Sequence, residues 1–178
     1  VLLFQKEMLL EEGLEEGPTE NIYKAEENNL RNQFRDTVKL YKNGLYKVAS
    51  LGIENESLID KNMPIRIMGY DYAVYRAQID RGEERKYPAI TIVLNFSDTE
   101  WKSPNRLYDI LDISPELRPY VNDYKIFVFN IAFLPEKIRK AFKSDFKIVA
   151  DFFAEKRLGR YNPKEHPEAI CHVEAVLN

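Results

Sequence analysis

One stretch of the chain constrains its fold more than any other: the apolar run YPAITIVLNF at residues 87–96. A half-exposed strand alternates apolar and polar residues, whereas a near-continuous apolar run is typical of a strand covered on both faces. Such strands are often parallel to their neighbours, and parallel strands need a crossover connection. The run therefore predicts a layered α/β protein with residues 87–96 as a buried strand.

The segment before this strand, residues 63–82, has the pattern of a helix. Pro64 suits the first turn of a helix, and Gly82 suits its end. Apolar residues recur at three- and four-residue spacing, so the pattern predicts one stripe that faces the core. The stripe consists of Ile65, Met68, Tyr72, Tyr75 and Ile79.

Two shorter runs before the helix predict a β-hairpin. Residues 34–41 (FRDTVKLY) and 45–56 (LYKVASLGIENE) are rich in β-branched and aromatic residues, with Asn43-Gly44 between them. Asn-Gly between such runs is the strongest short-range hairpin signal. Strand, strand, helix and buried strand, in this order, indicate an α/β layer with a crossover.

The remainder of the chain predicts simpler elements. A short helix is expected near residues 106–111, a strand at 123–134 and one long helix from Pro135. That helix would turn the following residues inward: Ile138, Phe142, Phe146, Val149 and Phe153. Residues 1–33 are expected to be an acidic, partly helical arm. The lack of an initiator Met and the amphipathic ending HVEAVLN suggest a fragment trimmed at both ends.

Composition limits the classes of protein that the chain can belong to. With 178 residues, 44% of them hydrophobic and 31% charged, it has the make-up of one soluble globular domain without a membrane span. A single cysteine, Cys171, excludes an internal disulfide, and the first residues lack the pattern of a signal peptide. The cytoplasm is therefore the expected compartment.

The distribution of charge leaves a nucleic-acid partner open despite a net charge of −3. Residues 1–33 carry eight acidic and three basic side chains, so the rest of the chain is net positive. Residues 135–164 carry nine basic and four acidic side chains, and such a patch can bind a phosphate backbone. The alternative interpretation of this patch is an ordinary solvated helix face.

Three carboxylates converge if the predicted hairpin closes. Asp36 lies early in the first run and Glu54 and Glu56 end the second, and positions 36 and 54 are equidistant from residue 45 beside the turn. At about 5 Å and an effective dielectric near 20, each pair of these charges repels by roughly 3 kcal/mol. A proton, a basic neighbour or a divalent cation must offset that repulsion. Mg²⁺ suits such a site and can activate water toward a phosphodiester, although acids at strand ends are also common as solvated bystanders.

A series of motifs in order resembles a known family. The motifs are Arg35-Asp36, residues 51–56 (LGIENE), 63–66 (MPIR), Tyr70-Asp71, Tyr75, Gln78, residues 87–94 (YPAITIVL), Trp101, Pro104 and residues 123–126 (DYKI). Together they resemble the recombination-promoting nuclease and putative transposase family over roughly residues 31–155. The resemblance implies a PD-(D/E)XK restriction-endonuclease-like core, which is a mixed β-sheet flanked by helices.

The same resemblance implies roles for individual residues. Asp36 and Glu54 would be the metal ligands, for Mg²⁺ or Mn²⁺, and Glu56 occupies the third catalytic position, where the superfamily has Lys and this family typically has Gln. Glu56 is then an extra ligand or water-orienting base, or the protein is weakened or inactive. Gln78, or Arg66 on the same helix, would supply the missing polar contact, unless both are plain helix surface.

These inferences combine into one hypothesis and its alternative. The chain is expected to comprise an arm (1–33), a nuclease-like domain (34–155) and a helical extension (156–178), and to cut DNA as a metal-dependent endonuclease. Arg66, Lys140, Lys143 and Lys147 would contact the DNA backbone. Alternatively, the chain is an inactive module for DNA binding or protein association. The apolar residues Leu2, Leu3 and Phe4 leave a homodimer open.

Overall fold

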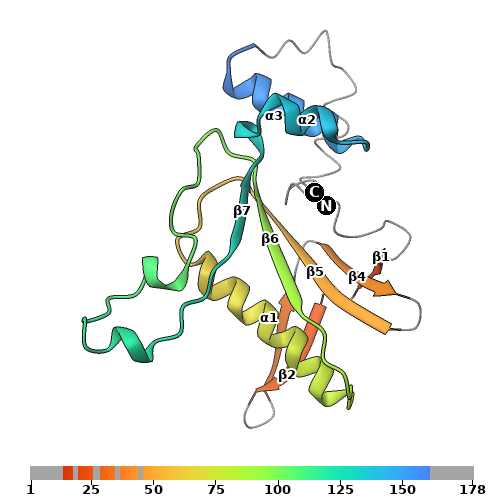
Figure 1. The fold of residues 1–178 in the computed structure, drawn as a ribbon, viewed down its shortest axis with the longest axis vertical. Coiled ribbons are helices and arrows are strands. Elements are labelled where there is room, and N and C mark those ends of the chain that lie inside the picture. The colour runs from red at the N-terminus through yellow and green to blue at the C-terminus, as the bar shows by residue number, and fades with distance from the viewer. Residues whose placement is uncertain (1–13, 18–19, 26–28, 35–36, 44–45, 161–178) are drawn as a thin grey trace.

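The structure is a computed structural model that describes residues 14–17, 20–25, 29–34, 37–43 and 46–160. In these residues a five-stranded mixed sheet has the order β1-β4-β5-β6-β7, and helices lie against it (Figure 1). This arrangement confirms the predicted mixed α/β fold. The strands of this sheet are β1 (Leu14–Glu16), β4 (Thr37–Asn43), β5 (Tyr46–Glu56), β6 (Ala89–Asn95) and β7 (Phe127–Asn130).

Strand pairing follows the sequence pattern closely. β4 and β5 are antiparallel, with Thr37 opposite Ile53, and a register shift lies between Tyr41 and Lys42. β6 is parallel to β5 on one side and to β7 on the other. The predicted hairpin strands and the predicted buried parallel strand are therefore confirmed, while the turn residue Gly44 lies outside the described residues.

The crossover between β5 and β6 is α1 (Met63–Asp80), which begins with Pro64 in its first turn and is followed by Gly82 at a positive φ of 65°. Met63, Ile67 and Tyr70 of this helix form a buried cluster with Val93 of β6. Alternate residues of a strand face opposite sides of the sheet. The contact with Val93 therefore places α1 on the face to which Val93 points.

The prediction that this apolar stripe of α1 faces the core is wrong, because its five residues lie on the outer side of the helix. Ile65, Tyr72 and Ile79 are 46%, 51% and 56% exposed, and Met68 and Tyr75 are exposed as well. The helix carries a second apolar stripe, through Met63, Ile67, Tyr70 and Val74, and this second stripe packs inward. Residue spacing alone does not tell which of two apolar stripes meets the sheet.

The opposite face of the sheet is covered near its end by α3 (Phe146–Arg157), which follows α2 (Glu136–Ala141). Leu94 of β6 packs there against Val149 and Phe153 of α3. The prediction of one long helix from Pro135 is wrong, because the backbone of Phe142 is extended (φ −67°, ψ 129°). The break lets the rings of Phe142 and Phe146 pack edge to face, with centroids 5.1 Å apart.

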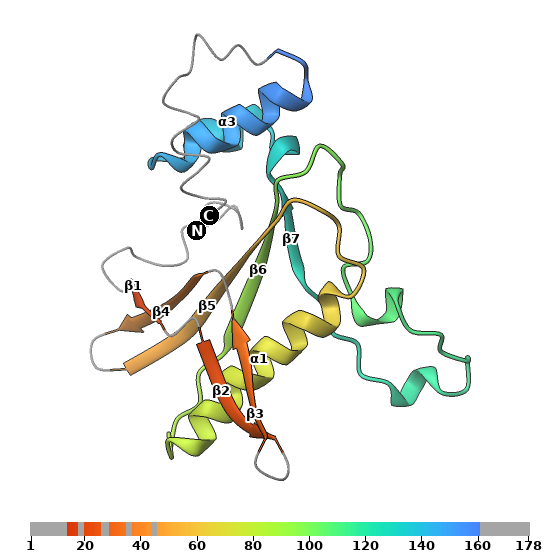
Figure 2. The ribbon, with the colours of Figure 1, turned by 180° about the vertical axis from the view of Figure 1, so that it is seen from behind.

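The first described residues are strands. β2 (Glu20–Ala25) and β3 (Asn29–Phe34) pair with each other as an antiparallel hairpin that lies against α1 (Figure 2). β1 joins the edge of the main sheet beside β4. The expectation of a partly helical arm is therefore wrong for the part of residues 1–33 that the structure describes.

The long connection from β6 to β7 contains short 3₁₀ turns at Leu107–Asp109 and Arg118–Tyr120. The first of them replaces the short helix expected near residues 106–111. Trp101 anchors the connection, because its side chain is 3% exposed and its Nε1 donates to the carbonyl of Pro104 at 2.9 Å. Among the described residues, no helix has the length and apolar character that crossing a membrane requires.

Candidate functional site

Glu54 and Glu56 lie at the carboxyl end of β5, the central strand of the sheet. They are two residues apart and therefore point to the same face, which is the face that α1 covers. Glu54 pairs in register with Val93, and Glu56 pairs with Asn95 at the end of β6. Ligands of open α/β sheets commonly bind at the carboxyl ends of parallel strands, so both glutamates stand where such a site is expected.

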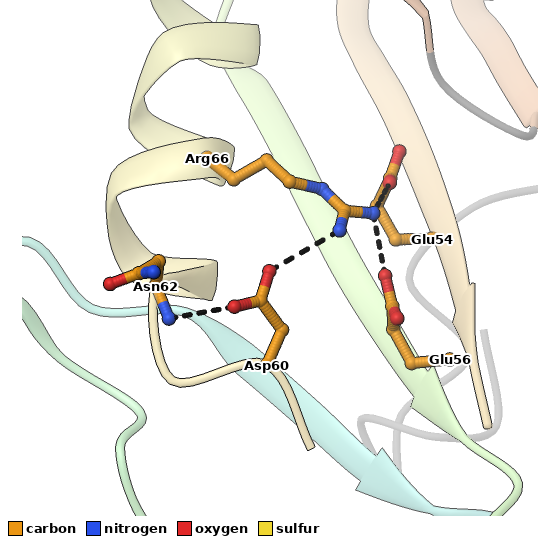
Figure 3. Close-up of polar contacts among 5 residues, drawn as sticks. All are labelled: Glu54, Glu56, Asp60, Asn62 and Arg66. Atoms are coloured by element: carbon orange, nitrogen blue, oxygen red, sulfur yellow. Dashed lines mark hydrogen bonds and ion pairs between the residues drawn. The ribbon is translucent and has the colours of Figure 1, made fainter. Parts of the chain in front are cut away.

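Arg66, from the first turns of α1, joins the two glutamates (Figure 3). Its Nη2 donates to Oε2 of Glu54 at 2.7 Å and to Oε1 of Glu56 at 2.5 Å. The side chain of Glu54 is 2% exposed and that of Glu56 is 16% exposed, whereas Arg66 is 38% exposed. The arginine therefore reaches from the solvent side and neutralises charge that the sheet has buried.

A third carboxylate, Asp60, completes this cluster. Its Oδ2 accepts from Nη1 of Arg66 at 3.3 Å, and its Oδ1 accepts from the backbone N–H of Asn62 at 2.8 Å (Figure 3). Asp60 thereby fixes the turn from which α1 begins and holds the arginine toward the strand ends. Among the described residues, three carboxylates therefore meet at one guanidinium.

The protonation of Arg66 follows from these neighbours. Burial acts to lower the pKa of its guanidinium, but the hydrogen bond to Glu54 and the charge of Glu56 outweigh burial and raise that pKa above its ordinary value. Arg66 is therefore a permanent cation, and only its movement, not its titration, can remove its charge from the cluster.

The residues present fit a hard divalent cation in donor type. Carboxylate oxygens are the ligands that Mg²⁺ prefers, and Glu54 and Glu56 place two carboxylates side by side. In the described part of the chain, no group of three or more acidic, histidine or cysteine side chains is arranged to hold a metal. The remaining predicted ligand, Asp36, lies outside the described residues. A cation bound by both glutamates would share them with Arg66 or displace it.

Two asparagines that sequence reasoning did not single out extend the row of polar groups. Asn95 and Asn130 end β6 and β7 in register with each other. Nδ2 of Asn95 donates to Oδ1 of Asn130 at 2.8 Å, and that Oδ1 also accepts from the backbone N–H of Trp101 at 2.8 Å. Each is a polar residue that interrupts an apolar run, IVLNF at 92–96 and FVFNIAF at 127–133, and this interruption is the signal that could have identified them.

Gln78, predicted to assist catalysis, has a different environment. It is fully buried, and its amide bonds the backbone of Tyr87 twice, donating through Nε2 at 3.0 Å and accepting at Oε1 at 2.9 Å. These bonds join the last turns of α1 to the segment that leads into β6. The structure therefore gives Gln78 a structural role that sequence reasoning missed, and does not bring it to Arg66 and the glutamates.

The lysines predicted to bind DNA lie on or between α2 and α3. Lys140 pairs with Glu136 at 2.5 Å, and Lys147 pairs with Asp151 at 2.5 Å, each one turn away on its own helix. Lys143, between the helices, is exposed. Arg66 is the predicted DNA contact that lies in the carboxylate cluster itself.

A second buried polar group lies further along α1. Asp71 is 5% exposed and accepts a hydrogen bond from Oγ1 of Thr91 at 2.6 Å and another from the hydroxyl of Tyr124. It ties the helix to β6 and to the segment before β7. A polar residue within an apolar helix face could have indicated this contact, but nothing in the sequence named its partners.

Fold and site together define a mixed α/β protein with a carboxylate pair at the carboxyl end of a central parallel strand. A family model described as "Putative transposase, YhgA-like" matches residues 26–152, which include the glutamates, Arg66 and the sheet from β4 to β7. The chain belongs to this transposase-like family. No curated protein and no solved structure gave a significant match.

Proposed function

We propose that the protein is a metal-dependent DNA endonuclease that acts in transposition or recombination. The observation that carries the proposal is the carboxylate pair of Glu54 and Glu56 at the strand end, held together by Arg66. Membership of a transposase-like family supports DNA as the substrate. The proposed core is that of the PD-(D/E)XK nucleases, as the sequence resemblance implies.

The proposed metal ligands are Asp36 and Glu54. Thr37 pairs with Ile53, and one residue further in each direction along the sequence stand Asp36 and Glu54. The hypothesis requires the carboxylates of these two residues to lie opposite each other across the strand pair. A bound Mg²⁺ or Mn²⁺ would supply Lewis acidity, which activates a water molecule and offsets charge on the leaving oxygen.

Arg66 has two tasks in this proposal. Without DNA and metal it neutralises Glu54 and Glu56, whose mutual repulsion would otherwise destabilise the strand end. When DNA binds, its guanidinium turns to a phosphate oxygen, for which its planar fork of donors is suited. The arginine thereby supplies the polar contact that Lys or Gln gives at the third position in related nucleases.

Glu56 is the proposed water-orienting residue. Its carboxylate is more exposed than that of Glu54, so it can reach a water molecule at the open side of the cluster. Lys143 is a proposed backbone contact, because it is exposed between α2 and α3. Lys140 and Lys147 would contact DNA only after exchanging their present carboxylate partners.

A cleavage assay on supercoiled plasmid with Mn²⁺ tests the proposal. Wild type should nick the plasmid, and Asp36→Ala and Glu54→Gln should each lower the rate at least about 100-fold, since each removes a ligand of the cation. Asp80→Asn, at an exposed acid in the last turn of α1, is the matched control and should cleave normally. Equal cleavage by wild type and Asp36→Ala would end the assignment.

The second candidate function is an inactive module that binds DNA or protein. The ion pairs of Arg66 favour it, because they give both glutamates a counter-charge without a metal. A folded protein that binds neither Mg²⁺ nor Mn²⁺ would establish this alternative. Cleavage gained by Glu56→Gln alone would show instead that one side chain separates the protein from activity.

A further inference from the structure

A pocket of about 410 Å³ lies at the carboxyl end of the sheet, between the strand ends and α3. Ser57, directly after Glu56, lines one side, and Lys156 and Arg157 from the last turn of α3 line the other. Phe96 and Phe153 also line it, with ring centroids 4.9 Å apart. Phe96 packs with α3, so the pocket lies on the α3 side of the strand ends, whereas Arg66 reaches them from α1.

The two basic residues of this pocket differ in their partners from two other lysines of α2 and α3. Lys140 and Lys147 are paired with carboxylates of their own helices. Within the described residues, neither Lys156 nor Arg157 forms an ion pair with a carboxylate. Their charge is therefore available to an anionic ligand.

Arg157 is also held in place before any ligand binds. Its Nε donates to the carbonyl of Ala132 at 2.9 Å, and its guanidinium lies 4.4 Å from the centroid of the Phe133 ring. A cation fixed by such contacts loses little side-chain entropy when it binds a phosphate. The terminal N–H groups of the guanidinium are the donors that a phosphate would use.

The rest of the lining suits the remainder of a nucleotide. Phe96 and Phe153 provide an apolar aromatic floor against which a sugar or base can pack. Asp98 on the rim can accept a hydrogen bond from an exocyclic amino group, and the hydroxyl of Ser57 can donate to a phosphate oxygen. The volume lies within the range of about 300–1,000 Å³ typical of small-ligand sites.

We propose that this pocket binds one nucleotide of the DNA strand next to the scissile position, with its phosphate on Lys156 and Arg157. The inference rests on the proposed DNA substrate and adds a binding site that the carboxylate cluster does not contain. Ser57 directly follows Glu56 in the chain. In this proposal a DNA strand that meets the glutamates continues past the carboxyl ends of the β-strands into the pocket.

Binding of a fluorescent single-stranded oligonucleotide to the full chain, in EDTA so that no cleavage occurs, tests the proposal. Lys156→Gln and Arg157→Gln should each weaken binding about tenfold, as loss of a charge-assisted contact implies. Each should also reduce the slope of log affinity against log salt by about 0.7, the value for one phosphate on a single strand. Lys102→Gln, an equal charge change at an exposed lysine, should leave binding within about twofold. Equal losses in all three variants would overturn the proposal.

A steric variant distinguishes binding in the pocket from non-specific attraction of the oligonucleotide to positive charge. Ser57→Leu narrows the pocket without changing charge and should weaken oligonucleotide binding as Lys156→Gln does, with an unchanged unfolding midpoint. Unaltered binding would contradict the pocket. Competition with dAMP distinguishes a free nucleotide from a strand: if Ser57→Leu abolishes dAMP binding but leaves the oligonucleotide unaffected, the strand proposal fails.

Its failure and that of the nuclease proposal are distinguishable. Pocket-dependent binding without any cleavage by wild type would support the pocket proposal and contradict the nuclease proposal. Cleavage by wild type, together with unimpaired binding by Lys156→Gln and Arg157→Gln, would support the nuclease proposal and contradict the pocket proposal.

Discussion

Asp71 and Arg66, two of the polar residues on the inner side of α1, contact different kinds of group. Asp71 accepts hydrogen bonds from two neutral hydroxyls, those of Thr91 and Tyr124, and is 5% exposed. Arg66 instead faces three carboxylates at the open end of the strands and is 38% exposed. Asp71 lies within the packed contact between α1 and the sheet, whereas the three carboxylates at Arg66 lie at the open strand end and offer the oxygen ligands that a divalent cation prefers.

The largest effect on stability is expected from Arg66→Met. Removing the guanidinium takes away the charged partner that Glu54 and Glu56 share, which should lower the free energy of unfolding by about 3 kcal/mol after allowance for partial exposure. Millimolar Mg²⁺ should restore part of that loss, because it binds the folded state and replaces the missing charge. Urea unfolding with and without Mg²⁺ measures both effects.

Arg76→Met is the matched control for this variant. Arg76 lies on the same helix and pairs with Asp80 at 3.1 Å on an exposed surface. Its removal should cost no more than about 0.5 kcal/mol and should not respond to Mg²⁺. If Mg²⁺ stabilised Arg66→Met no more than wild type, the claim that a cation can replace Arg66 at the strand end would be contradicted.

Asp71→Ala should have the next largest effect, of about 2 kcal/mol, because the hydroxyls of Thr91 and Tyr124 lose their acceptor inside the protein. Unlike Arg66→Met, this variant should gain nothing from Mg²⁺. Asp80→Ala, at an exposed acid of the same helix, is the control. A stability of Asp71→Ala that rose with Mg²⁺ would make Asp71, rather than the strand end, the metal-sensitive group.

The smallest effect concerns Asp151 on α3. Burial acts to raise the pKa of its carboxyl, but the hydrogen bonds from Lys147 and Arg139 outweigh burial and hold that pKa below its ordinary value. A depressed carboxyl pKa adds stability above the unfolded-state value of about 3.9, and that stability is lost as pH falls through the folded-state value.

The stability gap between wild type and Asp151→Asn should therefore be present at neutral pH and shrink under acid conditions. Thermal unfolding across that pH range would reveal it. A gap that widened as pH fell would contradict the direction of the shift.

Much of the fold follows from local patterns in the sequence. The apolar run around Val93 predicted a buried parallel strand, and Asn43-Gly44 predicted the antiparallel pair that sets Thr37 opposite Ile53. These elements were predictable because strand period and turn chemistry are local properties. The same reasoning placed Glu54 and Glu56 at a strand end and on one face.

What sequence reasoning could not give depends on packing between distant segments. Ile65 and Ile67 are equally apolar, and only the docking of α1 on β6 decides which of them is buried. The sequence suggested that Gln78 assists catalysis, but in the fold its side-chain amide is bonded to the backbone of Tyr87. The ion pairs of Arg66 were likewise invisible, because they join a strand end to a helix through a turn that holds Asp60.

The most direct test of the central claim is the binding of Mn²⁺, followed by its electron paramagnetic resonance signal, to wild type and to Glu54→Gln. The account predicts one site in wild type and at least about tenfold weaker binding in the variant, since a charged ligand is lost. An unchanged dissociation constant in Glu54→Gln would contradict it, because the cation would then be held elsewhere.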